Sequence, residues 1–222
     1  CRAHPERSAA RLTVARRLDA VLQVLAEQFH ALSVPELVAV VAAVLYLLLA
    51  IRQNIWCWFF AGLSTALYVV LFIDAKLYME SLLHVFYFAM AIYGCWFWLT
   101  RGPDTSGPRV TRWPIRVHGA AVASIVLLSS ATGFLLARFS DAAFPYIDSL
   151  TTFAAIWTTF LVAHKVLQNW WYWLVIDGVS VWLYWERGLE LTAALFVAYL
   201  VMIPFGLVAW SRAMQDEPAA AT

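Results

Sequence analysis

The chain has 222 residues, of which 63% are hydrophobic and 13% charged, and its formal net charge is +1. Soluble domains carry about 25% charged residues, so this composition indicates a protein of the lipid bilayer. Nucleic acid is excluded as a partner, because phosphate binding needs concentrated Lys and Arg and the apolar segments contain no such cluster. The three cysteines lack metal-ligand spacing, so we expect no disulfide framework, no metal and no cofactor.

Residues 1–34 differ from the rest, since five arginines precede the amphipathic stretch LDAVLQVLAEQFHAL. This segment is too short and too charged to cross a bilayer, which requires about 20 apolar residues. We therefore expect an interfacial helix or a loose tail.

Seven apolar segments follow, and we predict each as a membrane-spanning helix. They cover residues 35–51, 55–73, 77–99, 116–137, 148–166, 170–186 and 189–211. The Pro-rich polar stretch TRGPDTSGPRVTRWP separates the third segment from the fourth. The predicted fold class is an all-α membrane protein with seven transmembrane helices, followed by a C-terminal tail of residues 212–222.

An internal repeat organises these segments. An offset of 115 aligns two sets of residues: Gln53, Asn54, Trp56 and Trp58 with Gln168, Asn169, Trp171 and Trp173. Further along the chain an offset of 112 aligns Tyr87, Gly94 and Trp98 with Tyr199, Gly206 and Trp210. We assign the difference of three residues to a shorter hairpin in the second copy. This predicts a first three-helix repeat over 35–99, a loop and linking helix over 100–147, and a second repeat over 148–211.

The linking helix crosses the membrane once, so both repeats enter from the same side, which is the 3+1+3 arrangement of parallel repeats. Seven Lys and Arg residues lie at one end of the predicted helices and three at the other, leaving the N-terminal tail aside. Positive charge favours the cytoplasmic side, so we expect a cytoplasmic C-terminus. The arginines of the N-terminal tail oppose this orientation.

Asp177 lies inside the aromatic stretch QNWWYWLVIDGVSVWLYW, residues 168–185. A charge at the centre of a bilayer costs about 2.5–3.5 kcal/mol, so it should face a wet cavity or a partner. A hydrogen-bonded clasp between helices is one interpretation, and a substrate or ion site is the one we favour. Residues spaced by three or four share its helical face: Trp170, Trp173, Ser180 and Tyr184.

The third apolar segment carries a similar face, formed by Glu80, His84, Tyr87 and Ala91. His84 either lines a pathway or joins two helices by a hydrogen bond. Most of the 12 tryptophans fit an aromatic belt at the membrane surfaces. For four of them ring stacking on a ligand competes with core packing: Trp58, Trp157, Trp173 and Trp182. The repeat pairs His84 with Phe196 and Asp177 with Gly62, which favours one asymmetric site over two equal ones.

Motifs for nucleotide triphosphate binding, zinc-dependent proteolysis and serine hydrolysis, namely GxxxxGK[ST], HExxH and GxSxG, are absent from the sequence. A passive or ion-coupled carrier is therefore favoured over a pump or an enzyme. An aromatic midplane site suits a small ring-bearing polar molecule, and Asp177 would favour a cationic ring. A membrane-embedded enzyme using Asp177 and His84 as acid and base, and a purely structural subunit, are the weaker alternatives.

The chain resembles the PnuC family of bacterial nicotinamide riboside transporters. The resemblance rests on WCWFFAGLSTALYVVLF with LYMESLLHVFYFAMAIYG, on AFPYIDS, and on NWWYWLVIDGVSVWLY with RGLELTAALF. It covers nearly all of residues 35–211 and implies a homotrimer in the bacterial inner membrane with a doubled SWEET-like fold. It also implies facilitated diffusion of nicotinamide riboside, followed by phosphorylation by a cytoplasmic kinase that traps the product.

The resemblance points to six site residues: Asn169, Trp173, Asp177, Ser180, His84 and Tyr87. Trp182 and Tyr184 complete the predicted substrate site. Family members often have Gln or Asn where His84 stands, and some have Asn where Ala91 stands. Similar proteins carry thiamine or riboflavin, so these vitamins are the alternative substrates.

Overall fold

A computed structural model describes residues 23–24, 26–74, 78–101, 108–140 and 144–216. Its long helices are α2 (Val34–Ile51), α3 (Trp56–Asp74), α4 (Tyr78–Arg101), α5 (Ile115–Phe139), α6 (Pro145–Ala163), α7 (Asn169–Glu186) and α8 (Glu190–Asp216). The predicted all-α class is confirmed. Six of these helices are long and apolar enough to cross a membrane, and α7 is not among them.

The helix boundaries follow local signals in the sequence. Ser33 caps α2: its Oγ accepts from the Glu36 backbone N–H at 3.4 Å, and the Glu36 carboxylate accepts from the Ser33 N–H at 2.7 Å. α6 includes Pro145, ahead of the span predicted from residue 148, because proline is tolerated in the first turn of a helix. It ends at Ala163, since Lys165 adopts φ 50°.

The predicted tails lie partly outside the described residues, which exclude 1–22 and 217–222. Residues 26–31 are helical, as expected for the amphipathic segment. Gln28 joins this helix to the start of α8, because its amide donates to Glu190 at 2.6 Å and accepts from the Leu191 N–H at 2.9 Å. α8 continues to Asp216, beyond the predicted end at residue 211, since no helix breaker stands between Gly206 and Pro218.

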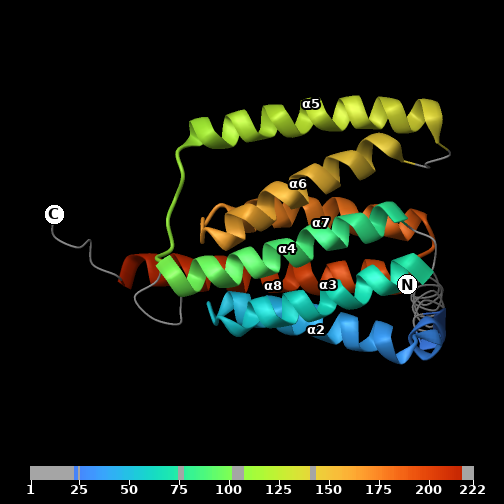
Figure 1. Cartoon of the computed structure of the whole chain (residues 1–222), viewed down its shortest axis with the longest axis horizontal. Helices are drawn as coiled ribbons and strands as arrows, with labels where there is room; N and C mark the ends of the chain where they lie inside the picture. Colours follow the sequence, from blue (N-terminus) through green and yellow to red (C-terminus); the bar gives the residue numbers. More distant parts are fainter. Residues whose placement is uncertain (1–22, 25, 75–77, 102–107, 141–143, 217–222) are drawn as a thin grey trace, which may run out of the picture.

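Successive helices run in alternating directions along the long axis of the molecule (Figure 1). α2, α4, α6 and α8 all finish at the end where the C-terminus lies, which we call the C-terminal end (Figure 1). Because α5 crosses the molecule once, α2 and α6 run in the same direction.

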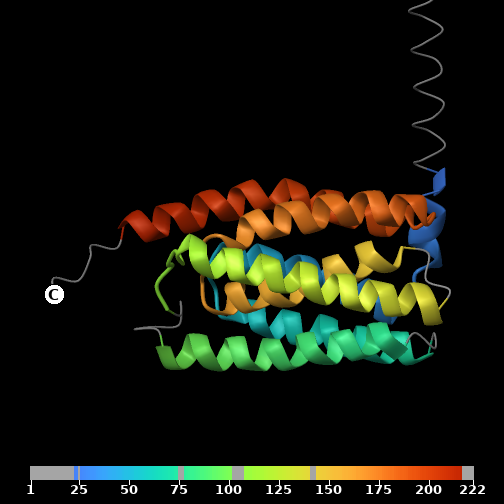
Figure 2. The same cartoon turned by 90° about the horizontal axis from the view of Figure 1, so that it is seen from above.

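Two groups of three helices pack side by side. In the first group α3 packs against α2 and α4, and in the second α7 packs against α6 and α8. The groups meet through α4 with α6 and through α2 with α8, so the first helix of each contacts the third helix of the other. α5 packs mainly against α6 and lies along the outside of the bundle (Figures 1 and 2). It also reaches α7, where His118 and the Tyr172 hydroxyl share a hydrogen bond of 3.1 Å.

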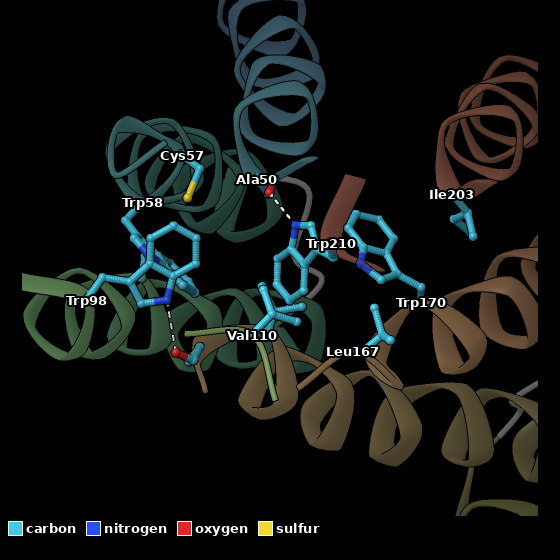
Figure 3. Packing of buried hydrophobic residues seen from close by; sticks show 12 residues of the cluster. Ala50, Cys57, Trp58, Trp98, Val110, Leu167, Trp170, Ile203 and Trp210 are labelled. Atoms are coloured by element: carbon cyan, nitrogen blue, oxygen red, sulfur yellow. Dashed lines mark hydrogen bonds between the residues drawn. The ribbon is translucent and has the colours of Figure 1, made fainter. Parts of the chain in front are cut away.

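Contacts in the two groups correspond at an offset of 112, the separation of Gln53 from Lys165. Trp58 and Trp98 meet edge to face with ring centroids 5.5 Å apart, and Trp170 and Trp210 do the same at 5.4 Å. The Trp98 indole donates to the Ala163 carbonyl at 2.9 Å and the Trp210 indole to Ala50 at 3.0 Å (Figure 3). Each tryptophan thereby joins its helix to the other group.

The predicted offset of 115 for the opening words of the repeat is therefore wrong. Trp58 corresponds to Trp170 rather than to Trp173, and α3 and α7 both end at positions related by 112, Asp74 and Glu186. The letters QN match at 115 because the α6–α7 turn has its own Gln and Asn. These two residues stand three positions after Lys165 and Val166, which are the true counterparts of Gln53 and Asn54. With the single offset of 112, the hairpins of the two copies have equal length, so the predicted shorter hairpin in the second copy is not needed.

Candidate functional site

α7 presents a polar face to the interior of the bundle. Asp177 and Ser180 are each 4% exposed, and Asn169, at the start of the helix, is fully buried. Their spacing puts them on one side of the helix together with Ile176 and Leu183, which are also buried. The predicted association of Asp177 with Ser180 is therefore present in the structure.

The Asp177 carboxylate receives no hydrogen bond and no ion pair from any described residue. Buried carboxylates in proteins are normally paired, because removing an isolated charge from water costs several kcal/mol or more. In a segment surrounded by apolar helices, such a group is expected to meet a solute, an ion or water. Asp177 is thus a buried acid to which no described residue supplies a hydrogen bond or an ion pair.

One tyrosine of another helix lies near this acid, and further tyrosines lie near that one. Tyr199 of α8 lies within electrostatic range of Asp177 and of Tyr68 on α3. Tyr46 of α2 lies within the same range of Tyr199 and of Tyr87 on α4. Tyrosines of the first helical group therefore lie near Tyr199 of the second, which lies near the acid on α7. Their hydroxyls are hydrogen-bond donors and acceptors of the kind that hydroxyl-bearing solutes need.

Sequence reasoning missed Tyr46 and Tyr68, and it used Tyr199 only as the repeat partner of Tyr87. A usable signal existed, since these tyrosines lie well inside apolar segments rather than at their ends, where an aromatic belt would put them. Their proximity to residues of other helices cannot be predicted from spacing within one helix.

Three of these tyrosines belong to two aromatic clusters, which occupy corresponding positions in the two groups. In the first, His84 contacts three rings at centroid distances of 5.0–5.7 Å, those of Tyr68, Phe72 and Tyr87. In the second, Phe196 stacks on Tyr184 at 5.2 Å and meets Tyr199 edge to face at 5.7 Å. The predicted residues His84, Tyr87 and Tyr184 are half-buried members of these clusters.

The remaining predicted residues divide between the interior and the outside. Trp173 is half-buried and packs on the hydrophobic core. The Asn169 amide donates to the Val166 carbonyl at 2.7 Å, and its Oδ1 has no partner among the described residues. Trp182 is 45% exposed and meets Phe144 at 5.5 Å, so the structure does not bring it to Asp177. The side chain of Glu80 lies outside the described part.

The corrected offset changes the counterpart of Asp177 from Gly62 to Thr65. Thr65 is polar, but its hydroxyl donates to carbonyls of its own helix, Ala61 at 2.8 Å and Gly62 at 3.2 Å. The acid therefore occurs in one group only, as the asymmetric site requires. Among the described residues no cluster of three or more His, Cys, Asp or Glu could hold a metal ion.

Comparisons with known proteins identify relatives of the whole helical region. The profile of a family described as "Nicotinamide mononucleotide transporter" matches residues 33–212. The nicotinamide riboside transporter PnuC of Escherichia coli K12 is 23% identical over 192 residues, covering 75% of this chain and 79% of that protein. The riboflavin/roseoflavin transporter RibM of Streptomyces davaonensis is 24% identical over 186 residues, covering 79% and 83%.

A solved structure shares the fold. The crystal structure of the vitamin B3 transporter PnuC superposes with a TM-score of 0.66 at 21% identity, covering 88% of this chain and 90% of that one. The family profile spans well over half of the sequence, and the helical arrangement agrees with it. The chain is a multi-pass membrane protein and belongs to the nicotinamide mononucleotide transporter family.

Proposed function

We propose that this protein transports nicotinamide riboside across the bacterial inner membrane by facilitated diffusion. The observation that carries the proposal is the buried Asp177 carboxylate without a partner among the described residues. Nicotinamide riboside joins a cationic pyridinium ring to a ribose. The acid would attract the cation, the aromatic clusters would contact its ring, and the tyrosine hydroxyls would bond the ribose and amide.

The charge of the site favours the riboside over the mononucleotide in the family description. A 5′-phosphate adds up to two negative charges, and close like charges repel in a medium of low dielectric constant. Asp177 would therefore disfavour the mononucleotide and favour the unphosphorylated cation. Phosphorylation by a cytoplasmic kinase would then prevent return of the product, which makes passive entry productive.

The proposed architecture is 3+1+3, with α7 as the seventh membrane span and α5 as the linking helix. The contacts repeated at an offset of 112 and the equal direction of α2 and α6 support it. The excess of Lys and Arg at the end holding the C-terminus supports a cytoplasmic C-terminus. Assembly as a homotrimer is proposed on the resemblance to the family.

A binding titration on the purified full-length protein tests the substrate. Nicotinamide riboside should bind, and Asp177→Asn should weaken binding at least tenfold, since hydrogen bonds to charged groups contribute about 1.5–3 kcal/mol. Asp74→Asn, which neutralises an exposed carboxylate at the end of α3, serves as the matched control and should bind as the wild type does. Equal affinity in both variants would remove Asp177 from the site.

Riboflavin is the second candidate, because the identity to RibM equals that to PnuC within one percentage point. Its isoalloxazine ring is neutral, so Asp177→Asn should affect riboflavin binding much less than binding of a cation. Competition with unlabelled riboflavin, thiamine and the mononucleotide separates these substrates. Uptake into proteoliposomes should yield unaltered riboside and should persist with a protonophore, whereas a protonophore-sensitive uptake would indicate proton coupling.

A further inference from the structure

The turn between α6 and α7 is buried, although turns normally lie at the surface, where water satisfies their backbone groups. Lys165, Val166 and Leu167 are 1%, 0% and 3% exposed. In contrast, residues of the α2–α3 and α7–α8 turns reach solvent, among them Arg52, Asn54, Gly188 and Leu189. The C-terminal end of the bundle is thus closed over the α6–α7 turn.

Residues 108–114, between α4 and α5, cover this turn and satisfy its backbone. Thr111 donates its N–H to the Lys165 carbonyl at 3.0 Å and accepts from the Leu167 N–H at 2.8 Å. The Gln168 amide donates to the Trp113 carbonyl at 2.9 Å and accepts from the Trp113 N–H at 3.3 Å. The backbone of the turn is therefore held independently of the Lys165 side chain.

The Lys165 side chain crosses from this turn to the first helical group. Its Nζ donates to Gln53 Oε1 at 2.7 Å and lies 4.5 Å from the centroid of the Trp98 ring. Lysine is among the residues least often buried completely, because its ammonium is strongly hydrated in water. Burying it needs compensation, which the amide oxygen and the aromatic face supply.

Gln53 and Lys165 are themselves corresponding residues, since their separation is the offset that relates the two groups. Both have a left-handed backbone, with φ 55° and 50°, which is uncommon outside glycine. Such conformations cost about 1–3 kcal/mol and persist where the surroundings enforce them, frequently at switch regions. One hydrogen bond therefore joins two equivalent, strained turns across the interface between the groups.

Buried polar atoms without partners lie next to these turns. The indole nitrogens of Trp58 and Trp170, which also correspond, have no hydrogen-bond partner among the described residues, and neither does Asn169 Oδ1. Both tryptophans are at most 3% exposed. Buried groups of this kind normally have partners, so a second arrangement, in which water or solute reaches them, would satisfy these atoms.

We infer that Gln53 and Lys165 form the gate that closes the pathway between the two helical groups at the C-terminal end. The inference rests on the proposed transport function. In the closed state Lys165 bonds Gln53 and lies over Trp98. Opening separates the two side chains and admits water or solute to Trp58 and Trp170.

Alkylation of Cys57 by a membrane-impermeant maleimide tests the gate without any substrate. Cys57 is fully buried next to Trp58 and lies within electrostatic range of Lys165 (Figure 3). The background is the full chain with Cys1→Ser and Cys95→Ser, reconstituted so that the reagent reaches the C-terminal end. Gln53→Lys, which opposes two ammonium groups, should raise the alkylation rate about tenfold or more, as expected when a hydrogen bond to a charged group is lost.

The double variant Gln53→Lys with Lys165→Gln supplies the decisive comparison. The two positions share a backbone conformation, and Trp210 occupies the place corresponding to Trp98. The exchanged pair should therefore reform the hydrogen bond. Because the effects of substitutions at two residues in contact do not simply add, the alkylation rate should return to within about twofold of the background. A wild-type rate in the single variant, or an unrescued rate in the double variant, overturns the gate.

Two further variants protect this test against a folding defect. Lys165→Met keeps an unbranched side chain only one atom shorter but removes its donors, and it should also raise the rate. Asp148→Asn breaks an ion pair on the first turn of α6, where Asp148 meets Arg187 at 2.6 Å, and it should leave Cys57 unchanged. Since alkylation needs no ligand, failure to bind nicotinamide riboside would overturn the proposed function but not the gate.

Discussion

Trp170 fills the space that a side chain on Gly206 would need. A methyl group added to Gly206 would overlap the Trp170 ring, and one added to Gly94 would overlap the ring of Trp58 in the same way. The close approach of α8 to α7, and of α4 to α3, therefore depends on glycine at these two corresponding positions. The tryptophan pairs, each joined to the other helical group by an indole hydrogen bond, can form only because these helices approach so closely.

Gly206→Ala should lower the stability of the folded protein. Alanine normally stabilises a helix by about 1 kcal/mol relative to glycine, but forcing a methyl group into a packed ring costs about 1–3 kcal/mol, so the net change is destabilising. Thermal unfolding in detergent measures it. Gly178→Ala is the control, because apart from its chain neighbours and the backbone of its own helix no atom lies within 4 Å of the added methyl group. Equal midpoints for both variants would contradict the packing described here.

Trp210→Phe and Trp98→Phe should each destabilise the contact between the helical groups. Each change removes an indole donor to a carbonyl near the end of the first helix of the other group. A hydrogen bond of this type contributes about 0.5–1.5 kcal/mol. The indole ring also fills more of the core than the phenyl ring that replaces it. Chemical denaturation should show a loss in both variants, whereas Trp185→Phe, at a position 51% exposed, should change little.

Tyr199→Phe should weaken binding of nicotinamide riboside by about threefold to tenfold, the effect of losing one hydrogen bond of about 0.5–1.5 kcal/mol. The ring and its contact with Phe196 remain, so stability should be preserved. Trp182→Ala should leave the affinity unchanged, since Trp182 is 45% exposed and contacts Phe144. A titration in which Trp182→Ala is the weaker binder would restore the stacking role that the sequence predicted.

Arg187→Gln should have a small effect on stability. Arg187 bonds Asp148 at 2.6 Å, but their side chains are 26% and 34% exposed. Partly exposed ion pairs contribute about 0–1 kcal/mol and are screened by salt. The unfolding midpoint should therefore fall only slightly, and the difference from wild type should shrink at high ionic strength. A large loss that salt does not reduce would show that the pair acts in a drier setting than its exposure indicates.

Local spacing predicted some of the candidate site and failed for the rest. Asp177 and Ser180 share a face because three residues turn a helix through nearly one full turn, and the structure buries both. Trp182 follows Asp177 by five residues, which puts the two about 140° apart around the helix. The prediction treated it as a ligand-stacking residue because of its chemistry, without regard to that angle.

The sequence by itself determined the helical segments and the presence of an acid on one face of α7. These features depend on hydrophobic length and on the period of a helix, both of which are local. Tertiary structure alone decided the offset of 112, the approach of Tyr199 to Asp177, and the burial of Lys165 against Gln53 and Trp98. Each of these joins residues distant in the chain, so each is fixed by how helices pack and not by the order of residues within any one helix.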